Sequence, residues 1–115
     1  MRIEEAQKQL AEAIRETDEY KYYMQCKSDA YENPTVGALL DEFSKLQTKL
    51  QMFALTGKEP DGEEMQRYQS LSALLFATPE ASAFLLSKIQ MQKKMADVFA
   101  YLSAEAGVPI DAPQI

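Results

Sequence analysis

The chain has 115 residues, of which 46% are hydrophobic and 26% charged, and a formal net charge of −6 at pH 7. This length predicts one domain, and the negative charge disfavours direct binding to nucleic acid phosphates or to an anionic membrane surface. The chain contains no histidine, so it lacks the commonest general base and the commonest metal ligand. We therefore expect no catalytic, metal or cofactor-binding residues, and we do not expect an enzyme.

The first helix is expected from near Ile3. Ile3, Ala6, Leu10 and Ala13 recur at spacings of three and four residues, which places them on one helical face. Thr17 is followed by two acidic residues and is a candidate N-cap for a new helix. One long helix and two helices bent at Thr17 both fit the pattern, and we favour the bend.

Four of the six tyrosines and the only cysteine lie in residues 19–31. If the phase of the first helix continues, Tyr20, Met24 and Tyr31 extend its apolar face and are expected to pack in the core or in a subunit interface. Tyr22 and Cys26 lie away from that face, so they form a candidate partner surface. The single cysteine, the lack of an apolar signal segment and the lack of a membrane-length apolar run predict a cytoplasmic protein.

Asn33-Pro34 ends this part, because proline disfavours helical geometry at the preceding residue and suits the first turn of the next helix. The following helix carries apolar residues in a seven-residue repeat. A narrow seam of this kind is typical of a helix packed against one neighbour, within the chain or in a dimer. The candidate packing or dimer seam consists of Val36, Leu39, Phe43, Leu46, Leu50 and Phe53.

Residues 56–62 interrupt the helical pattern. Gly57 suits the left-handed conformation that follows a helix end, and Pro60 comes shortly after it. We expect the next helix from Asp61 or Gly62. Its apolar stripe comprises Met65, Tyr68, Leu71, Leu75 and Thr78.

The last helix is expected to begin at Thr78-Pro79, with Thr78 as a candidate N-cap, and to stop at Gly107. Its apolar residues cover a wide arc, which predicts burial against two neighbours rather than one. Residues 108–115 are expected to form an extended C-terminal tail, beyond a single helical domain of residues 1–107.

These patterns predict an all-α fold with four to five helices, including a long antiparallel helical hairpin. A chain of 115 residues with long helices has few layers with which to cover both helix faces. Dimerisation solves that problem, so we expect a homodimer, either intertwined or side by side.

The segments "AIRETDEYKYY", "LLDEFSKLQTKLQ", "TGKEPDGEEMQRYQSL" and "TPEASAFLLSKIQMQKKMADVFAYLS" follow one another in this order, with an Asn-Pro turn between the first two. In this order the chain resembles the YlbF/YmcA (Com_YlbF) family of small helical proteins of Gram-positive bacteria. The resemblance runs from about Leu10 to about Leu102. Its markers are Tyr20, Tyr23, Phe43, Gln47, Gly57, Tyr68 and Leu71.

The resemblance implies an all-α fold, often dimeric, that acts with protein partners as a regulator of competence, sporulation or biofilm formation. It also implies an association with the endoribonuclease RNase Y that influences RNA processing. The resulting hypothesis is a non-enzymatic regulatory or adaptor protein. The alternative is an iron–sulfur-carrying subunit in which Cys26 is a ligand shared with partner chains, because some family members carry clusters and one thiol cannot supply four ligands.

Overall fold

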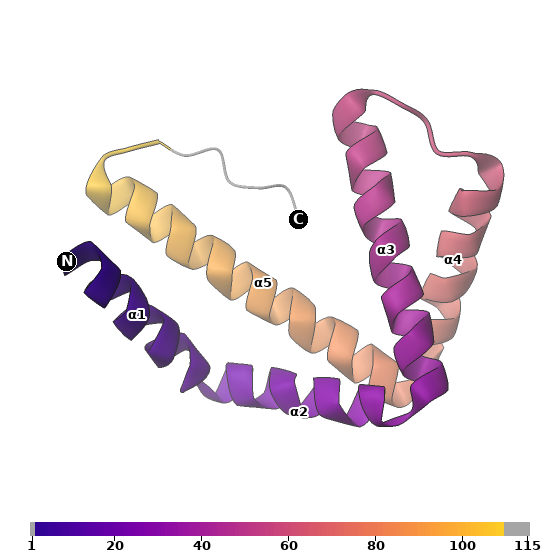
Figure 1. Cartoon of the computed structure of the whole chain (residues 1–115), viewed down its shortest axis with the longest axis horizontal. Helices are drawn as coiled ribbons and strands as arrows, with labels where there is room; N and C mark the ends of the chain where they lie inside the picture. The colour runs from indigo at the N-terminus through magenta and orange to yellow at the C-terminus, as the bar shows by residue number, and fades with distance from the viewer. Residues whose placement is uncertain (1, 110–115) are drawn as a thin grey trace. The chain divides into compact units, whose positions relative to one another are not determined.

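A computed structural model describes residues 2–109, which form five α-helices and no strand (Figure 1). The helices are α1 (Arg2–Arg15), α2 (Asp18–Glu32), α3 (Pro34–Thr56), α4 (Gly62–Ala77) and α5 (Pro79–Ala106). The predicted all-α fold is therefore confirmed, at the upper end of the expected helix number. Of the predicted C-terminal tail, residues 110–115 lie outside the described residues.

Contacts between backbones divide the described chain into two compact units. Unit 1 consists of residues 2–25 together with residues 86–109, and unit 2 consists of residues 26–85. We describe each unit by itself. The single domain expected over residues 1–107 stays a prediction.

The break between α1 and α2 lies where the sequence placed it. The Tyr20 backbone N–H donates a hydrogen bond to the Thr17 hydroxyl oxygen at 3.2 Å, which satisfies a donor that the new helix leaves unpaired. The same hydroxyl donates to the Ile14 carbonyl at 2.7 Å, and so ties the N-cap of α2 to the end of α1. The bend at Thr17 is confirmed, and a single continuous helix is not formed.

The ends of α3 also follow the sequence signals. The Asn33 side chain accepts hydrogen bonds from the backbone N–H groups of Thr35 and Val36, with proline in the first turn. At the other end Gly57 adopts φ 74°, and its N–H donates to the Phe53 carbonyl. Glycine occupies this left-handed position without the steric cost that a Cβ brings.

The start of α4 follows its sequence signal. Asp61 caps α4 by accepting from the N–H groups of Glu63 and Glu64 at 2.8 and 3.0 Å. At the other end of α4, the Thr78 hydroxyl donates back to the Leu74 carbonyl at 2.8 Å, and Thr78 is the C-cap of this helix. Its role as N-cap of α5 stays a prediction.

Unit 2 contains the predicted antiparallel hairpin, formed by α3 and α4. The rings of Phe43 and Tyr68 stack with centroids 5.1 Å apart, and further along α3 Lys49 pairs with Glu64. Residues later in α3 therefore contact residues earlier in α4, so the two helices run antiparallel. The buried apolar side chains of the described chain all belong to this unit, and they are Cys26, Ala30, Val36, Leu40, Phe43, Leu71, Leu75, Ala81, Phe84 and Leu85.

The turn between α2 and α3 is held by Tyr31. Its ring meets the Phe84 ring edge-on at 5.8 Å, and its hydroxyl donates to the Asp41 carboxylate at 2.8 Å. The ring also lies against the backbone of Gly37, where an added Cβ would come 2.9 Å from the Tyr31 Cδ1 atom. Glycine at this helical position therefore allows the close approach of the aromatic ring.

Candidate protein-interaction surface

The face that α2 buries is not the one expected from the sequence. Cys26 is 6% exposed and Ala30 is fully buried, whereas Met24 is 42% exposed. The expectation carried the phase of α1 across Thr17, but the new cap starts α2 in a phase of its own. Met24 is therefore not part of the core of the single chain, and its assignment to a subunit interface stays a prediction.

The structure exposes only one member of the candidate partner surface of Tyr22 and Cys26, although the two residues lie one turn apart on α2. Tyr22 is 56% exposed in unit 1, whereas Cys26 is buried in unit 2. A buried thiol offers no contact area to another protein. Tyr22 remains as the exposed member of the pair, and a tyrosine brings a large rigid ring to an interface.

Cys26 is the one thiol that this chain could supply to a shared iron–sulfur cluster, and that alternative stays a prediction. Such clusters take four cysteine thiolates as ligands, and the chain has this one, buried among the side chains of unit 2. Among residues 2–109, no three His, Cys, Asp or Glu side chains lie close enough together to hold a metal ion.

The heptad seam of α3 lies in unit 2. Val36 and Phe43 are buried, and Leu39, Leu46, Leu50 and Phe53 are partly exposed. Phe43 meets Tyr68 of α4, and the Lys49 ammonium lies 5.8 Å from the centroid of the Phe53 ring while it pairs with Glu64 of α4. At these positions the neighbour of the seam is α4 of the same chain.

Unit 1 is built differently, because none of its apolar side chains in the described chain is buried. One of its helical stretches is α1 with the first part of α2, and the other is α5. The two run antiparallel, because residues early in the first stretch lie beside residues late in α5. Two open cavities of about 340 and 450 Å³ lie between the stretches. The first is lined by Ile14, Tyr20, Tyr23, Lys88, Met91, Gln92 and Met95, and the second by Leu10, Lys94, Asp97, Val98, Tyr101 and Leu102.

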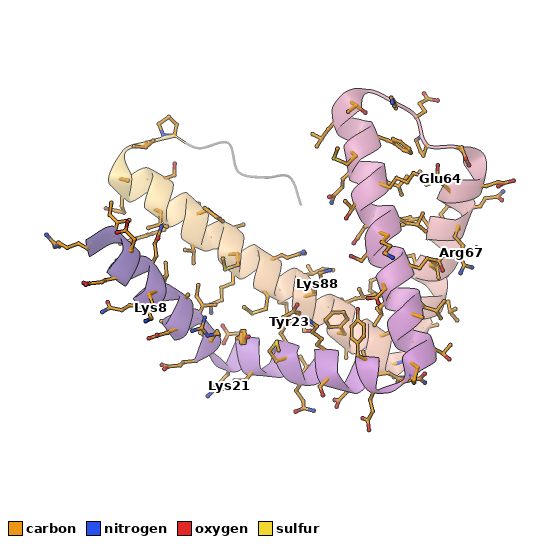
Figure 2. The ribbon with its side chains drawn as sticks, viewed as in Figure 1. Lys8, Lys21, Tyr23, Glu64, Arg67 and Lys88 are labelled. Atoms are coloured by element: carbon orange, nitrogen blue, oxygen red, sulfur yellow. The ribbon has the colours of Figure 1, made fainter. Side chains whose placement is uncertain are left out.

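We call these two cavities together the unit 1 groove. Its floor is formed by aromatic, methionine and aliphatic side chains, and its charges are few. Tyr23 of α2 and Lys88 of α5, both labelled in Figure 2, come from its two walls. Grooves with apolar walls and a thin polar rim are the usual form of sites that receive a helix of another protein.

One ion pair joins the two walls of unit 1. The Lys94 ammonium of α5 contacts the Glu19 carboxylate of α2. The hydrogen bond from Lys94 is the main cause that lowers the pKa of Glu19 below its usual value. Lys94 also lines the second cavity together with Asp97, so the groove carries charged side chains beside its apolar ones.

The rest of α5 in unit 1 is unusually exposed for its composition. Ile89, Phe99 and Leu102 are 54%, 45% and 46% exposed. The wide apolar arc of α5 predicted burial against two neighbours, and this chain does not cover the arc in the described residues. The α5 wall of the groove had a signal in the sequence, because Met91, Met95, Val98 and Leu102 repeat at spacings of four, three and four. The sequence analysis did not single out this repeat, because other apolar residues of α5 lie on either side of it.

Within residues 2–109, no single helix is both long enough and apolar enough to cross a bilayer. α4 and α5 meet the length and composition criterion only as a pair, across a sharp bend. Leu71, Leu75 and Phe84 near this bend are buried within unit 2.

Comparison with known proteins finds a matching family model and similar bacterial proteins. The family model described as "Control of competence regulator ComK, YlbF/YmcA" matches residues 3–105. A UPF0342 protein of Streptococcus pyogenes serotype M4 is 28% identical over 78% of this chain and 80% of its own length. A UPF0342 protein of Caldicellulosiruptor saccharolyticus is 24% identical over 78% of this chain and 75% of its own.

A solved structure shares the fold. It is described as a protein of unknown function (DUF964) from Bacillus stearothermophilus, with a TM-score of 0.78, 17% identity, and coverage of 93% of this chain and 94% of that one. Because the family model matches nearly the whole described chain, the resemblance seen in the sequence is confirmed. The chain belongs to the Com_YlbF (YlbF/YmcA) family.

Proposed function

We propose that this chain is a non-enzymatic regulatory adaptor that works in the cytoplasm through protein contacts. The observation that carries the proposal is the family match over residues 3–105, whose description names the control of a competence regulator. The groove and the exposed apolar side chains of unit 1 support contact with other proteins as the mode of action. The chain also forms a homodimer under this proposal.

The partner we propose is an RNase Y-type endoribonuclease, whose RNA processing the adaptor modulates, and through it competence, sporulation or biofilm development. The net charge of −6 supports an indirect route to RNA. A protein that binds RNA by itself neutralises phosphates with an excess of lysine and arginine, which this chain lacks. An effect on RNA therefore passes through the partner.

The test combines binding with RNA processing. The full chain and the RNase Y-type enzyme of the same host are mixed, and complex formation is measured by sedimentation velocity. In parallel, transcript ends are mapped in a strain that lacks the chain. We expect a complex and shifted transcript ends, restored by the wild-type gene. Absence of a complex together with unchanged transcript ends would contradict the proposal.

Tyr22 gives this proposal a residue-level prediction. Replacing the 56% exposed Tyr22 with alanine removes a ring that we propose lies in the enzyme interface. Central aromatic anchors of interfaces cost about 2 kcal/mol or more when truncated, so the dissociation constant is expected to rise by roughly 30-fold. Leu74→Ala, at a 51% exposed position of unit 2, is the matched control and is expected to bind as wild type. Equal binding by both variants would remove Tyr22 from the interface.

A further inference from the structure

We propose that residues 110–115 form a strap that folds back along one face of α5 and covers the apolar side chains there. The described chain supplies the starting point of this path. After α5, Gly107 adopts φ 71°, and the backbone N–H groups of Gly107 and Val108 both donate to the Ser103 carbonyl, at 3.1 and 3.2 Å. The Ser103 hydroxyl donates in turn to the Val108 carbonyl at 2.7 Å. Val108 is thus held beside Ser103, so the strap leaves from this face of α5.

The face of α5 that carries Ser103 has an uncovered apolar stripe. Its residues recur at spacings of three and four, and they are Ile89, Gln92, Ala96, Phe99 and Ser103. Ile89 and Phe99 are 54% and 45% exposed. No residue of this stripe lines the second cavity of the unit 1 groove, and Gln92 alone lines the first. The stripe therefore borders the groove and gives α5 a separate apolar surface.

The composition of the strap suits this surface. Pro109 and Pro113 disfavour an α-helix and favour the polyproline II conformation, in which three residues make one turn. Asp111 and Gln114 are three residues apart, so in this conformation they fall on one polar edge. The other two edges carry the apolar residues of the strap, which are Ile110, Ala112, Pro113 and Ile115. The strap therefore lays its apolar edges on α5 and keeps the polar edge in water.

The length of the strap matches the length of the stripe. A polyproline II segment advances about 3.1 Å per residue, and an α-helix rises about 1.5 Å per residue. A strap that starts level with Ser103 and runs antiparallel to α5 brings Ile110 level with Phe99, after about 6 Å. Ile115 then comes level with Ile89, after about 22 Å. The two isoleucines of the strap thus reach the two large exposed side chains of the stripe, and the groove is left as the open apolar side of unit 1.

The test observes the δ1 methyl groups of the five isoleucines in the full chain by NMR. We expect a nuclear Overhauser contact between the Ile110 methyl group and the Phe99 ring, and a ring-current shift of the Ile110 signal that Phe99→Leu removes. Phe76→Leu on α4, where the ring is 43% exposed in unit 2, is the matched control and is expected to leave the Ile110 signal in place. An Ile110 signal at its random-coil position in the wild type would overturn the proposal.

A sample that mixes isotope-labelled and unlabelled copies distinguishes a strap on its own chain from one that reaches a second copy. We expect the contact within labelled copies, and a contact found only between copies would overturn the fold-back.

A dye that fluoresces on exposed apolar surface gives an independent readout. Replacing Ile110 and Ile115 together with serine is expected to raise the dye fluorescence, as does ending the chain at Pro109, because both uncover the stripe. Gln114→Ser on the polar edge is the matched control and is expected to match the wild type. Equal fluorescence from all four proteins would overturn the proposal, and neither readout depends on the proposed partner enzyme.

Discussion

Leu71 and Leu75 lie one turn apart on α4 and are each 1% exposed, which makes them the largest fully buried side chains of the described chain. They belong to unit 2, where the buried apolar side chains are concentrated. Close packing leaves such side chains no room to relax, so removing atoms from them creates a cavity. The stability of unit 2 therefore depends on a few positions that can be tested singly.

Leu71→Ala is expected to lower the free energy of unfolding by about 2–5 kcal/mol, because it loses burial and leaves a cavity. Leu74 lies on the same helix and is 51% exposed, so Leu74→Ala is the matched control and is expected to stay within about 0.5 kcal/mol of wild type. Urea denaturation followed by circular dichroism measures both. Similar losses for the two variants would contradict the burial described for unit 2.

Glu42 and Arg67 tie α3 to α4 at the surface of unit 2. The Arg67 Nε and Nη2 atoms donate to the two Glu42 carboxylate oxygens at 2.6 and 2.7 Å. This two-pronged hydrogen bond is the main cause that lowers the pKa of Glu42 and raises the pKa of Arg67. Because the folded chain prefers the charged carboxylate, protonation of Glu42 opposes folding.

The pair therefore predicts a pH dependence of stability. Its contribution is fully present above the ordinary glutamate pKa of 4.5, and it is lost as pH falls through the lowered pKa of Glu42 in the folded chain. Glu42→Gln is expected to lose less stability than wild type between pH 6 and pH 3, measured by denaturant midpoints. Glu12→Gln on the exposed face of α1 is the control, expected to follow the wild-type curve. If stability falls equally with pH in the wild type and both variants, the Glu42–Arg67 pair does not contribute to the pH dependence.

At the scale of elements, residues at the helix ends determine where each helix begins and stops. Thr17, Asn33 and Asp61 each accept backbone N–H groups of the helix they precede, and Gly57 and Gly107 end helices with φ of 74° and 71°. These signals act over three or four residues, so they depend little on tertiary packing.

Gly57→Ala is expected to destabilise the chain by about 1–2 kcal/mol, because φ 74° forces a Cβ against the following carbonyl. No atom lies within 4 Å of the added Cβ, so the cost is one of backbone conformation alone. Gly62 at the start of α4 also has open space around it, and its φ is not positive. Gly62→Ala should leave the denaturation midpoint unchanged or slightly raised, and an equal loss for both variants would contradict this assignment.

The sequence predicted the helix order, the breaks and an antiparallel hairpin, because caps and heptad spacing are local patterns. It failed where a position depends on the geometry of a break. The phase of α2 could not be read across Thr17, so the burial of Cys26 and the exposure of Met24 were missed. The unit 1 groove was also missed, because it joins residues near positions 10–23 to residues near 88–102, and no local pattern specifies that pairing.

At the scale of the whole molecule, the two units differ in how far each completes a core from this chain. Unit 2 buries an apolar core of its own, whereas the described part of unit 1 buries none of its apolar side chains. A regulatory adaptor needs a stable scaffold and a surface for other proteins, and this division supplies both within one short chain. The central claim is that the chain acts through contact between the exposed apolar surface of unit 1 and another protein.

Hydrogen exchange of the backbone amides, measured by mass spectrometry with and without the RNase Y-type enzyme, tests this claim most directly. The account predicts slower exchange in unit 1 when the enzyme is present, with no change in the α3–α4 hairpin. Exchange in unit 1 that the enzyme leaves unchanged, or protection confined to the α3–α4 hairpin, would contradict it.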